Sequence, residues 1–365
     1  MRGNQGKYPH VAKLIKSRIV RGVYDDLLPG EDRLARELSV SPGTVRTALA
    51  YLEGQGFVRR ERRRGTFVLR QDRVSGGGRG AFIRVFLPTY DWSGFAAPVL
   101  NALRETAEAY RLSTFLTDIG RTGTGASPEG GVASREGWQG DVLSAAGEPR
   151  CVGSVLVSVR VETGDALALA DARTPVMVMD WEMPEPILPS VVGDYKGAGE
   201  LAARHLIQLG HRGIGWMHLG EVSNPNHALR LVGIRETLAR VGLKLTREIS
   251  RNTGEILPGQ LESCFAGPDR LTAVICSNPT RLTATVSAIR KAGLRVPEDV
   301  SIVGIGPSRD EITPLHPTMV SLDFGTMGKR AVELLLDEDA LDNPRREVIP
   351  GRLELGSTSA EAPEA

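Results

Sequence analysis

From Phe82 onward, short apolar runs alternate with longer amphipathic segments, and this alternation is the feature that most restricts the fold. Runs such as VGSVLVSV and VSIVGIG have the length and composition of buried strands. Amphipathic segments at 196–209, 226–241 and 280–292 predict helices between such runs. Strands that alternate with helices are typical of parallel sheets, so the sequence predicts an α/β fold built from βαβ units.

The α/β region, residues 81–357, is larger than one hydrophobic core comfortably supports, so we expect two lobes. Within it, the stretch 120–140 contains seven glycines and no apolar periodicity, which predicts a long loop. A phosphate-cradling loop is the alternative there, although neither common glycine spacing is present. The last residues, 358–365, have the composition of a disordered tail.

The first residues of the chain differ from the rest in charge. Residues 1–75 contain 16 Lys/Arg and 8 Asp/Glu, a net charge of +8, whereas the remainder contains 29 and 36, a net charge of −7. A basic segment before an acidic body indicates an anionic partner. Three amphipathic helices and a two-stranded hairpin are expected in residues 1–72, and the glycine-rich segment 73–80 is expected to be a flexible linker.

The second and third of these helices form a predicted helix-turn-helix. Ser41 is a plausible N-cap of the third helix, and Pro42 suits its first position. Polar side chains near that N-terminus lie where such a helix meets base edges and phosphates in the major groove. A helical hairpin with a solvated polar face is the alternative interpretation.

The hairpin carries the stretch RRERRRGTFV, with five arginines in residues 59–64. A targeting signal and a solvated loop are alternatives, but a rigid basic hairpin also suits a DNA minor groove. The residues predicted to contact DNA are Arg33, Ser41, Gly43, Thr44, Arg46, Thr47, Arg62, Arg63, Arg64 and Gly65.

Residues 8–70 resemble a GntR-family winged helix. The shared pattern is an LP-x-E-x-x-LA segment, a T-V-R helix start, an A-L-x-x-L-x-x-x-G core and a final G-T-F-V strand. The family often has arginine where this chain has Pro42, and glycine where it has Arg63. The resemblance implies binding to double-stranded DNA at a near-palindromic operator, with a base preference of its own.

Residues 81–340 resemble the effector-binding body of the LacI family, a two-lobed fold shared with periplasmic sugar-binding proteins. The strings HLIQLGHRGI and GLRVPEDVSIVG carry this resemblance. It implies three chain crossings between the lobes, expected near 193–195, 305–308 and 321–325, and a small-molecule site between the lobes. The residues that the resemblance proposes for ligand binding are Trp92, Phe95, Asp180, Trp181, Arg230, Phe265, Asn278 and Asp323.

Two departures weaken the expectation of an ordinary sugar ligand. Ser277-Asn278-Pro279 replaces the family's Asn-Asp, and Gly306-Pro307 stands where the family has two aspartates. The effector could therefore be a sugar, a less hydroxylated molecule, or absent from a degenerate sensor.

Other classes fit less well. We expect no cofactor and no metal site, because the three cysteines are far apart and the histidines have poor metal spacing. A pyridoxal-phosphate enzyme would need a strand lysine, and the lysines beyond residue 16 all occupy helical or turn settings. Without an apolar leader or membrane-length run, a cytoplasmic location is expected. The sequence thus predicts a homodimeric, ligand-responsive transcription regulator, with a repressor as the first expectation.

Overall fold

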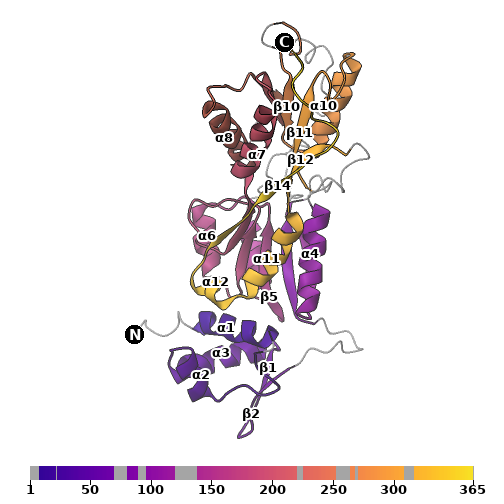
Figure 1. The fold of residues 1–365 in the computed structure, drawn as a ribbon. Coiled ribbons are helices and arrows are strands. Elements are labelled where there is room, and N and C mark those ends of the chain that lie inside the picture. The colour runs from indigo at the N-terminus through magenta and orange to yellow at the C-terminus, as the bar shows by residue number, and fades with distance from the viewer. Residues whose placement is uncertain are drawn as a thin grey trace.

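The computed structural model describes residues 8–21, 23–69, 80–88, 96–119, 138–219, 225–251, 264–267, 270–307 and 316–364. Three bodies follow one another along its length: a small helical head, an N-lobe next to it and a C-lobe at the far end (Figure 1). No helix in these ranges is long and apolar enough to cross a membrane.

The head has the predicted three helices and hairpin. Helix α3 begins where the sequence predicts, because the hydroxyl of Ser41 accepts a hydrogen bond from the Thr44 amide and Pro42 occupies the first turn. The segment before α2 is hydrogen-bonded to the hairpin, because the Leu28 amide donates to the Thr66 carbonyl at 2.9 Å. The elements are α1 (Tyr8–Val20), α2 (Glu31–Glu37), α3 (Pro42–Gly54), β1 (Val58–Glu61) and β2 (Gly65–Val68).

The N-lobe is a six-stranded sheet in the order β13-β7-β6-β5-β3-β4, and the strand pairs within it are parallel. Its central strand β5 is buried along its whole length, as its continuous apolar run predicts. The elements are β3 (Phe82–Leu87), α4 (Ala96–Ala109), β4 (Ser113–Asp118), α5 (Trp138–Ala146), β5 (Cys151–Val157), α6 (Thr163–Ala170), β6 (Val176–Met179), β7 (Ser190–Gly193), α11 (Phe324–Leu336), α12 (Glu338–Asp342) and β13 (Arg346–Ile349).

The C-lobe is a second six-stranded sheet, in the order β14-β12-β11-β10-β8-β9, with β14 antiparallel to β12. The two-lobed α/β expectation is confirmed. The elements are α7 (Tyr195–Gln208), β8 (Ile214–Leu219), α8 (Pro225–Ala239), β9 (Arg247–Arg251), β10 (Ala273–Cys276), α10 (Pro279–Lys291), β11 (Ser301–Gly306), β12 (Thr318–Leu322) and β14 (Gly351–Glu354).

The chain crosses between the lobes at 193–195, 322–324 and 349–351. The crossings at 193–195 and 322–324 agree with the prediction. The prediction of a crossing at 305–308 is wrong. Strands β11 and β12 pair in parallel within the C-lobe sheet, so the described residues before and after this position belong to the same lobe. The third crossing joins β13 to β14, a short polar segment whose strand character the sequence analysis overlooked.

The tail also differs from its prediction. Thr358 is 1% exposed, and its hydroxyl donates to the Ile302 carbonyl at 2.7 Å. The Ala362 amide donates to the Leu209 carbonyl at 2.8 Å, so the segment is bonded to the C-lobe. The composition of this segment suggested disorder. It does not reveal that small Ser, Thr and Ala residues can pack closely along a neighbouring strand.

Other predictions fall partly outside the described ranges. Residues 73–79 of the linker and 120–137 of the glycine-rich stretch lie there, while 138–140 begin helix α5. The three cysteines are free and buried, as expected.

Candidate nucleic-acid interface and interlobe site

Most of the residues predicted to contact DNA are exposed on the head. Ser41, Gly43, Arg46 and Thr47 are exposed around the first turns of α3, and Arg62–Gly65 form the exposed tip of the hairpin. In Figure 1 this hairpin points away from the N-lobe. We call these exposed residues the reading surface; both the helix N-terminus and the basic tip within it are accessible to a DNA duplex.

Two glutamates organise the arginines of this surface. Glu31 contacts Arg46 of α3 at 2.9 Å and Arg60 of β1 at 3.0 Å, so it joins the helix to the hairpin. Glu61 contacts Arg59 at 2.8 Å and Arg64 at 2.7 Å. These contacts reduce the charge available to a phosphate, since each arginine must exchange a carboxylate for it.

Arg62 and Arg63 differ from their neighbours, because neither forms an ion pair within the described part of the chain. Arg63 has a φ of 65°, and Gly65 has a φ of 115°, which together shape the tight turn. A Cβ on Gly65 would also lie 2.9 Å from Leu27. The hairpin tip therefore presents two uncompensated guanidinium groups on a conformationally restricted turn.

Two predicted DNA contacts occupy other positions. Thr44 is only 3% exposed, and its hydroxyl lies 2.8 Å from that of Ser41, so it belongs to the cap of α3. Arg33 is exposed on α2 but pairs with Glu37 on the same helix at 2.8 Å. The exposed reading surface is thus narrower than the sequence suggests.

A second polar cluster lies where the N-lobe and C-lobe meet. Asp180 follows β6, is 6% exposed, and has a φ of 59°, which is unusual for a residue other than glycine. The Ser158 hydroxyl donates to Asp180 Oδ2 at 2.6 Å, and the Tyr195 hydroxyl donates to Oδ1. From α8 of the C-lobe, Asn226 Nδ2 donates to both the carboxylate and the carbonyl of Asp180 at 3.1 Å. We refer to Ser158, Asp180, Tyr195, Asn226, His227 and Arg230 as the interlobe cluster.

Close packing of α7 and α8 brings the C-lobe side chains to this cluster. A Cβ on Gly199 would lie 2.1 Å from the Arg230 carbonyl, and one on Gly233 would lie 2.1 Å from the Lys196 carbonyl. Only glycine permits this approach. Arg230 is therefore held with its guanidinium 4.7 Å from the Tyr195 ring centroid, a cation–π contact.

Burial dominates the electrostatics of the interlobe cluster. It raises the pKa of Asp180, although the hydrogen bonds from Ser158 and Tyr195 and the charge of Arg230 act in the opposite direction. It lowers the pKa of Arg230, against the opposing effects of Tyr195 and Asp180. Burial, with the charges of Arg230 and His218, lowers the pKa of His227 to about 3, so this ring is neutral at pH 7. The cluster can thus offer a carboxylate, a guanidinium and a neutral imidazole to a polar ligand.

The other residues proposed for ligand binding either have structural partners or lie outside the described residues. Trp181 lies in the N-lobe core, where its indole donates to the Val161 carbonyl at 3.1 Å. Asn278 and Asp323 cap helices: their side chains accept from the amides of Arg281 and Thr326, each at 2.8 Å. Phe265 packs against C-lobe core residues, and Trp92 and Phe95 lie outside the described residues.

Four members of the interlobe cluster were not predicted from the sequence: Ser158, Tyr195, Asn226 and His227. A usable signal existed for two of them. Ser158 directly follows β5, as Asp180 follows β6, and the carboxyl ends of parallel strands share one edge of a sheet. Asn226 precedes Arg230 by four positions, so both lie on the same face of α8.

Two known protein families match separate parts of the chain. Residues 7–68 match the bacterial regulatory proteins of the gntR family. Residues 203–359 match the periplasmic binding protein-like domain. The chain is a fusion of a GntR-type head and a periplasmic-binding-protein-like body.

Curated relatives include the HTH-type transcriptional repressor PurR of Pasteurella multocida, which is 33% identical over 214 residues, 56% of this chain and 63% of that protein. The PurR repressor of Photobacterium profundum is 26% identical over 231 residues, 60% of this chain and 66% of that protein. The chain spans about half to two thirds of the length of the curated relatives it matches. These relatives are named as transcriptional repressors.

Solved structures show the same body fold. A LacI transcriptional regulator from a Rhodococcus species aligns with a TM-score of 0.63 and 22% identity, over 78% of this chain and all of that one. At this identity, the likeness establishes the fold of the body.

Proposed function

We propose that the chain is a ligand-responsive, sequence-specific DNA-binding transcription regulator, and specifically a repressor. The observation that carries this proposal is the joining of an exposed basic reading surface to a two-lobed body with a buried polar cluster between its lobes. The naming of the curated relatives as transcriptional repressors supports it.

The regulator would act as a homodimer on a near-palindromic operator, because a two-fold protein matches a two-fold site. The effector would be a sugar or sugar-like molecule bound at the interlobe cluster. Asp180 suits ligand hydroxyls, and Arg230 suits a hydroxyl or carboxylate oxygen. A ligand that binds one arrangement of the lobes better than another would shift the population between them.

DNA selection from a random-sequence library tests the regulator function. We expect the full-length chain to enrich a sequence with two related half-sites. Enrichment of no sequence at moderate salt would contradict specific regulation.

The hairpin tip offers a sharper test on the selected duplex. Replacing Arg63 and Arg64 with alanine should flatten the log–log salt dependence of binding by about one unit per lost phosphate contact. Arg290→Ala, at the exposed end of α10 in the C-lobe, is the matched control and should leave the slope unchanged. If the variant without Arg63 and Arg64 also kept the wild-type slope, the hairpin tip would not contact the phosphate backbone of DNA.

A sensor without a ligand is the second candidate, favoured by a specific observation. The Asp180 carboxylate already accepts bonds from Ser158, Tyr195 and Asn226, and Asn278 is occupied as a helix cap. Thermal-shift screening with sugars, sugar acids and polyols separates the two candidates, because a tight ligand raises the melting temperature. No shift with any of them would favour the ligand-free sensor.

A further inference from the structure

Helix α1 supplies several hydrogen bonds and ion pairs between the head and the N-lobe. Helix α1 uses its apolar residues, such as Val11 and Ile15, for the head's own core. Polar residues on the same helix are also buried, among them Lys16 and Ser17, which are 1% and 3% exposed. A solvated helix face would not bury a lysine this completely, so the head and N-lobe share a built interface.

Lys16 Nζ donates to the Cys151 carbonyl at the start of β5 at 2.6 Å, and two other polar residues of α1 bond to carbonyls that helix ends leave unsatisfied. Lys13 Nζ donates to the Ala170 carbonyl at the end of α6 at 3.2 Å, and the Ser17 hydroxyl donates to the Leu336 carbonyl at the end of α11. The last carbonyls of a helix have no partner within it and lie at its negative end, which favours such donors. Two helices of the N-lobe are therefore capped by the head.

Ionic contacts lie beside these caps. Arg18 binds Glu338 of α12 through both carboxylate oxygens, with its Nε at 2.9 Å from each and its Nη2 at 2.8 Å from Oε2. His10 lies 2.8 Å from Asp342 on the same helix. We call the N-lobe side of this contact the docking platform: Cys151, Ala170, Leu336, Glu338 and Asp342.

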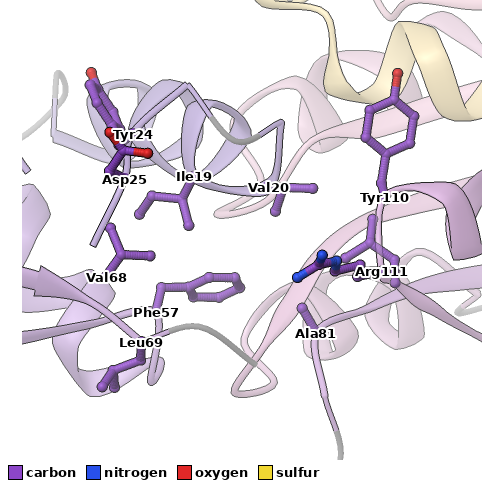
Figure 2. Close-up of a pocket in the computed structure, with 11 residues that line it drawn as sticks. Ile19, Val20, Tyr24, Asp25, Phe57, Val68, Leu69, Ala81, Tyr110 and Arg111 are labelled. Atoms are coloured by element: carbon purple, nitrogen blue, oxygen red, sulfur yellow. The ribbon is translucent and has the colours of Figure 1, made fainter. Parts of the chain in front are cut away.

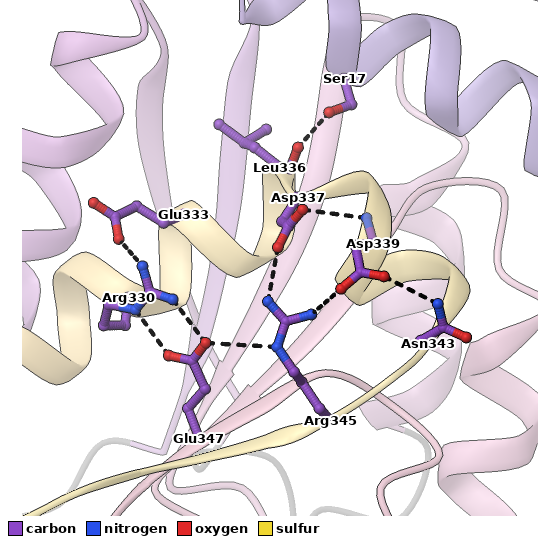
Figure 3. A network of polar contacts seen from close by, with 9 residues as sticks. All are labelled: Ser17, Arg330, Glu333, Leu336, Asp337, Asp339, Asn343, Arg345 and Glu347. Carbon is purple, nitrogen blue, oxygen red and sulfur yellow. Dashed lines mark hydrogen bonds and ion pairs between the residues drawn. The ribbon is translucent and has the colours of Figure 1, made fainter. Parts of the chain in front are cut away.

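A further network of ion pairs holds the α12 part of the docking platform against the rest of the N-lobe. Arg345 contacts Asp337 and Asp339 at 2.8 Å on either side of Glu338 (Figure 3). Arg330 of α11 contacts Glu347 of β13 at 2.7 Å. The platform is thus held against both α11 and β13, the elements that lead to two of the three crossings between the lobes.

The apolar part of the contact is incomplete. A cavity of about 280 Å³ separates head residues such as Val20 and Phe57 from Ala81, Tyr110 and Leu112 of the N-lobe (Figure 2). Polar contacts from α1 therefore provide much of what holds the head, and they can be exchanged for water. Because the hairpin points away from the platform, this contact leaves the DNA-reading surface exposed (Figure 1).

From this geometry we propose that the platform fixes the orientation of the winged helix, so that a dimer presents its two reading surfaces at the spacing of a two-part operator. This role rests on the proposed DNA-binding function. A held head loses less orientational freedom when DNA binds than a tethered one, so docking favours sites that need both heads.

Charge reversal at Arg18 and Glu338 tests the proposal in the full-length chain. The first readout needs no DNA: the anisotropy decay of a dye on a cysteine introduced at Arg36, an exposed position of α2. Arg18→Glu and Glu338→Arg should each release the head and add a fast decay component. The double variant should restore the slow decay, because it rebuilds the pair with its signs exchanged.

The second readout is affinity for the duplex that the wild-type chain selects from a random library. Each single variant should lose about tenfold or more in affinity for the two-half-site duplex and change less than twofold on a duplex with one half-site. The double variant should recover. Glu338→Arg leaves the head unaltered, so its loss could not come from a damaged reading surface.

Two results would overturn the proposal: a head that stays immobile in both single variants, or a released head with unchanged two-half-site affinity. If the wild-type chain selected no sequence, the proposed regulator function would fail instead, while the anisotropy would still report whether the platform holds the head.

Discussion

The contact between the two lobes (the lobe joint) and the contact between the head and the N-lobe (the head joint) each bury a charged side chain. The two side chains differ in the hydrogen bonds they form. At the lobe joint, Asp180 accepts bonds from Ser158, Tyr195 and Asn226. At the head joint, Lys16 donates to the Cys151 carbonyl at 2.6 Å and lies 4.8 Å from the Phe57 ring centroid. A buried charge is costly unless its bonding capacity is filled. Burial disfavours the charge at both joints, but Asp180 has three side-chain donors whereas Lys16 has one carbonyl acceptor, so we expect the head joint to separate first.

Removal of the Asp180 carboxylate should produce the largest effect. Asp180→Ala leaves the donors of three side chains without their acceptor and Arg230 buried without a nearby carboxylate. We expect the free energy of unfolding to fall by about 3–5 kcal/mol, as when one partner of a buried charged network is removed. Chemical denaturation of the full-length chain measures this loss.

Asp323→Ala is the matched control for that substitution. Both aspartates were proposed as ligand residues from sequence, but Asp323 is an exposed cap of α11. Loss of a cap typically costs about 1 kcal/mol. Equal losses for the two variants would show that the interlobe cluster contributes no more to stability than a helix cap.

The contact between the head and the N-lobe should tighten as pH rises, because burial disfavours the charged form of Lys16. Burial lowers the pKa of Lys16 to about 8, with the neighbouring Lys13 acting in the same direction and the Cys151 thiol against it. A lysine whose pKa is lowered in the docked state releases its proton more readily there, so docking strengthens as pH rises through 8. Below that pH the full penalty of the buried charge remains.

Between pH 7 and pH 9, this shift should increase the ratio of docked to undocked heads about tenfold per lysine affected. Lys13, whose pKa burial also lowers to about 8, adds to the effect. An Arg18→Ala background makes both states measurable by the anisotropy of the labelled head. Docking that weakens over this range would contradict the assignment of Lys16 as a buried, charged group at neutral pH.

The sequence predicted the parts of the molecule that follow local rules. Ser41 and Pro42 mark the start of α3, and the apolar run of β5 predicts a buried strand, because both signals depend on near neighbours. Arg230 was found through a family pattern and does lie in the interlobe cluster.

What the sequence could not supply were contacts between distant residues. Lys16 lies on a helix face that reads as solvated, and only the position of Cys151, 135 residues later, makes it buried. Trp181 and Asp180 are adjacent in sequence, yet one faces the N-lobe core and the other the C-lobe. Strand β13 is short and polar, so its role in the third crossing had no sequence signal.

Replacement of Lys16 itself should have the smallest effect and sharpens the comparison most. Lys16→Met keeps the aliphatic packing against Phe57 and removes the charge, while the Cys151 carbonyl loses its donor. The removed charge penalty offsets the lost hydrogen bond, so we expect docking at pH 7 at least as tight as in the wild-type chain, and a smaller response between pH 7 and pH 9. The same head anisotropy measures both quantities. If Lys16→Met instead released the head by more than tenfold, the lysine would be a net stabilising contact, and the head joint would resemble the lobe joint after all.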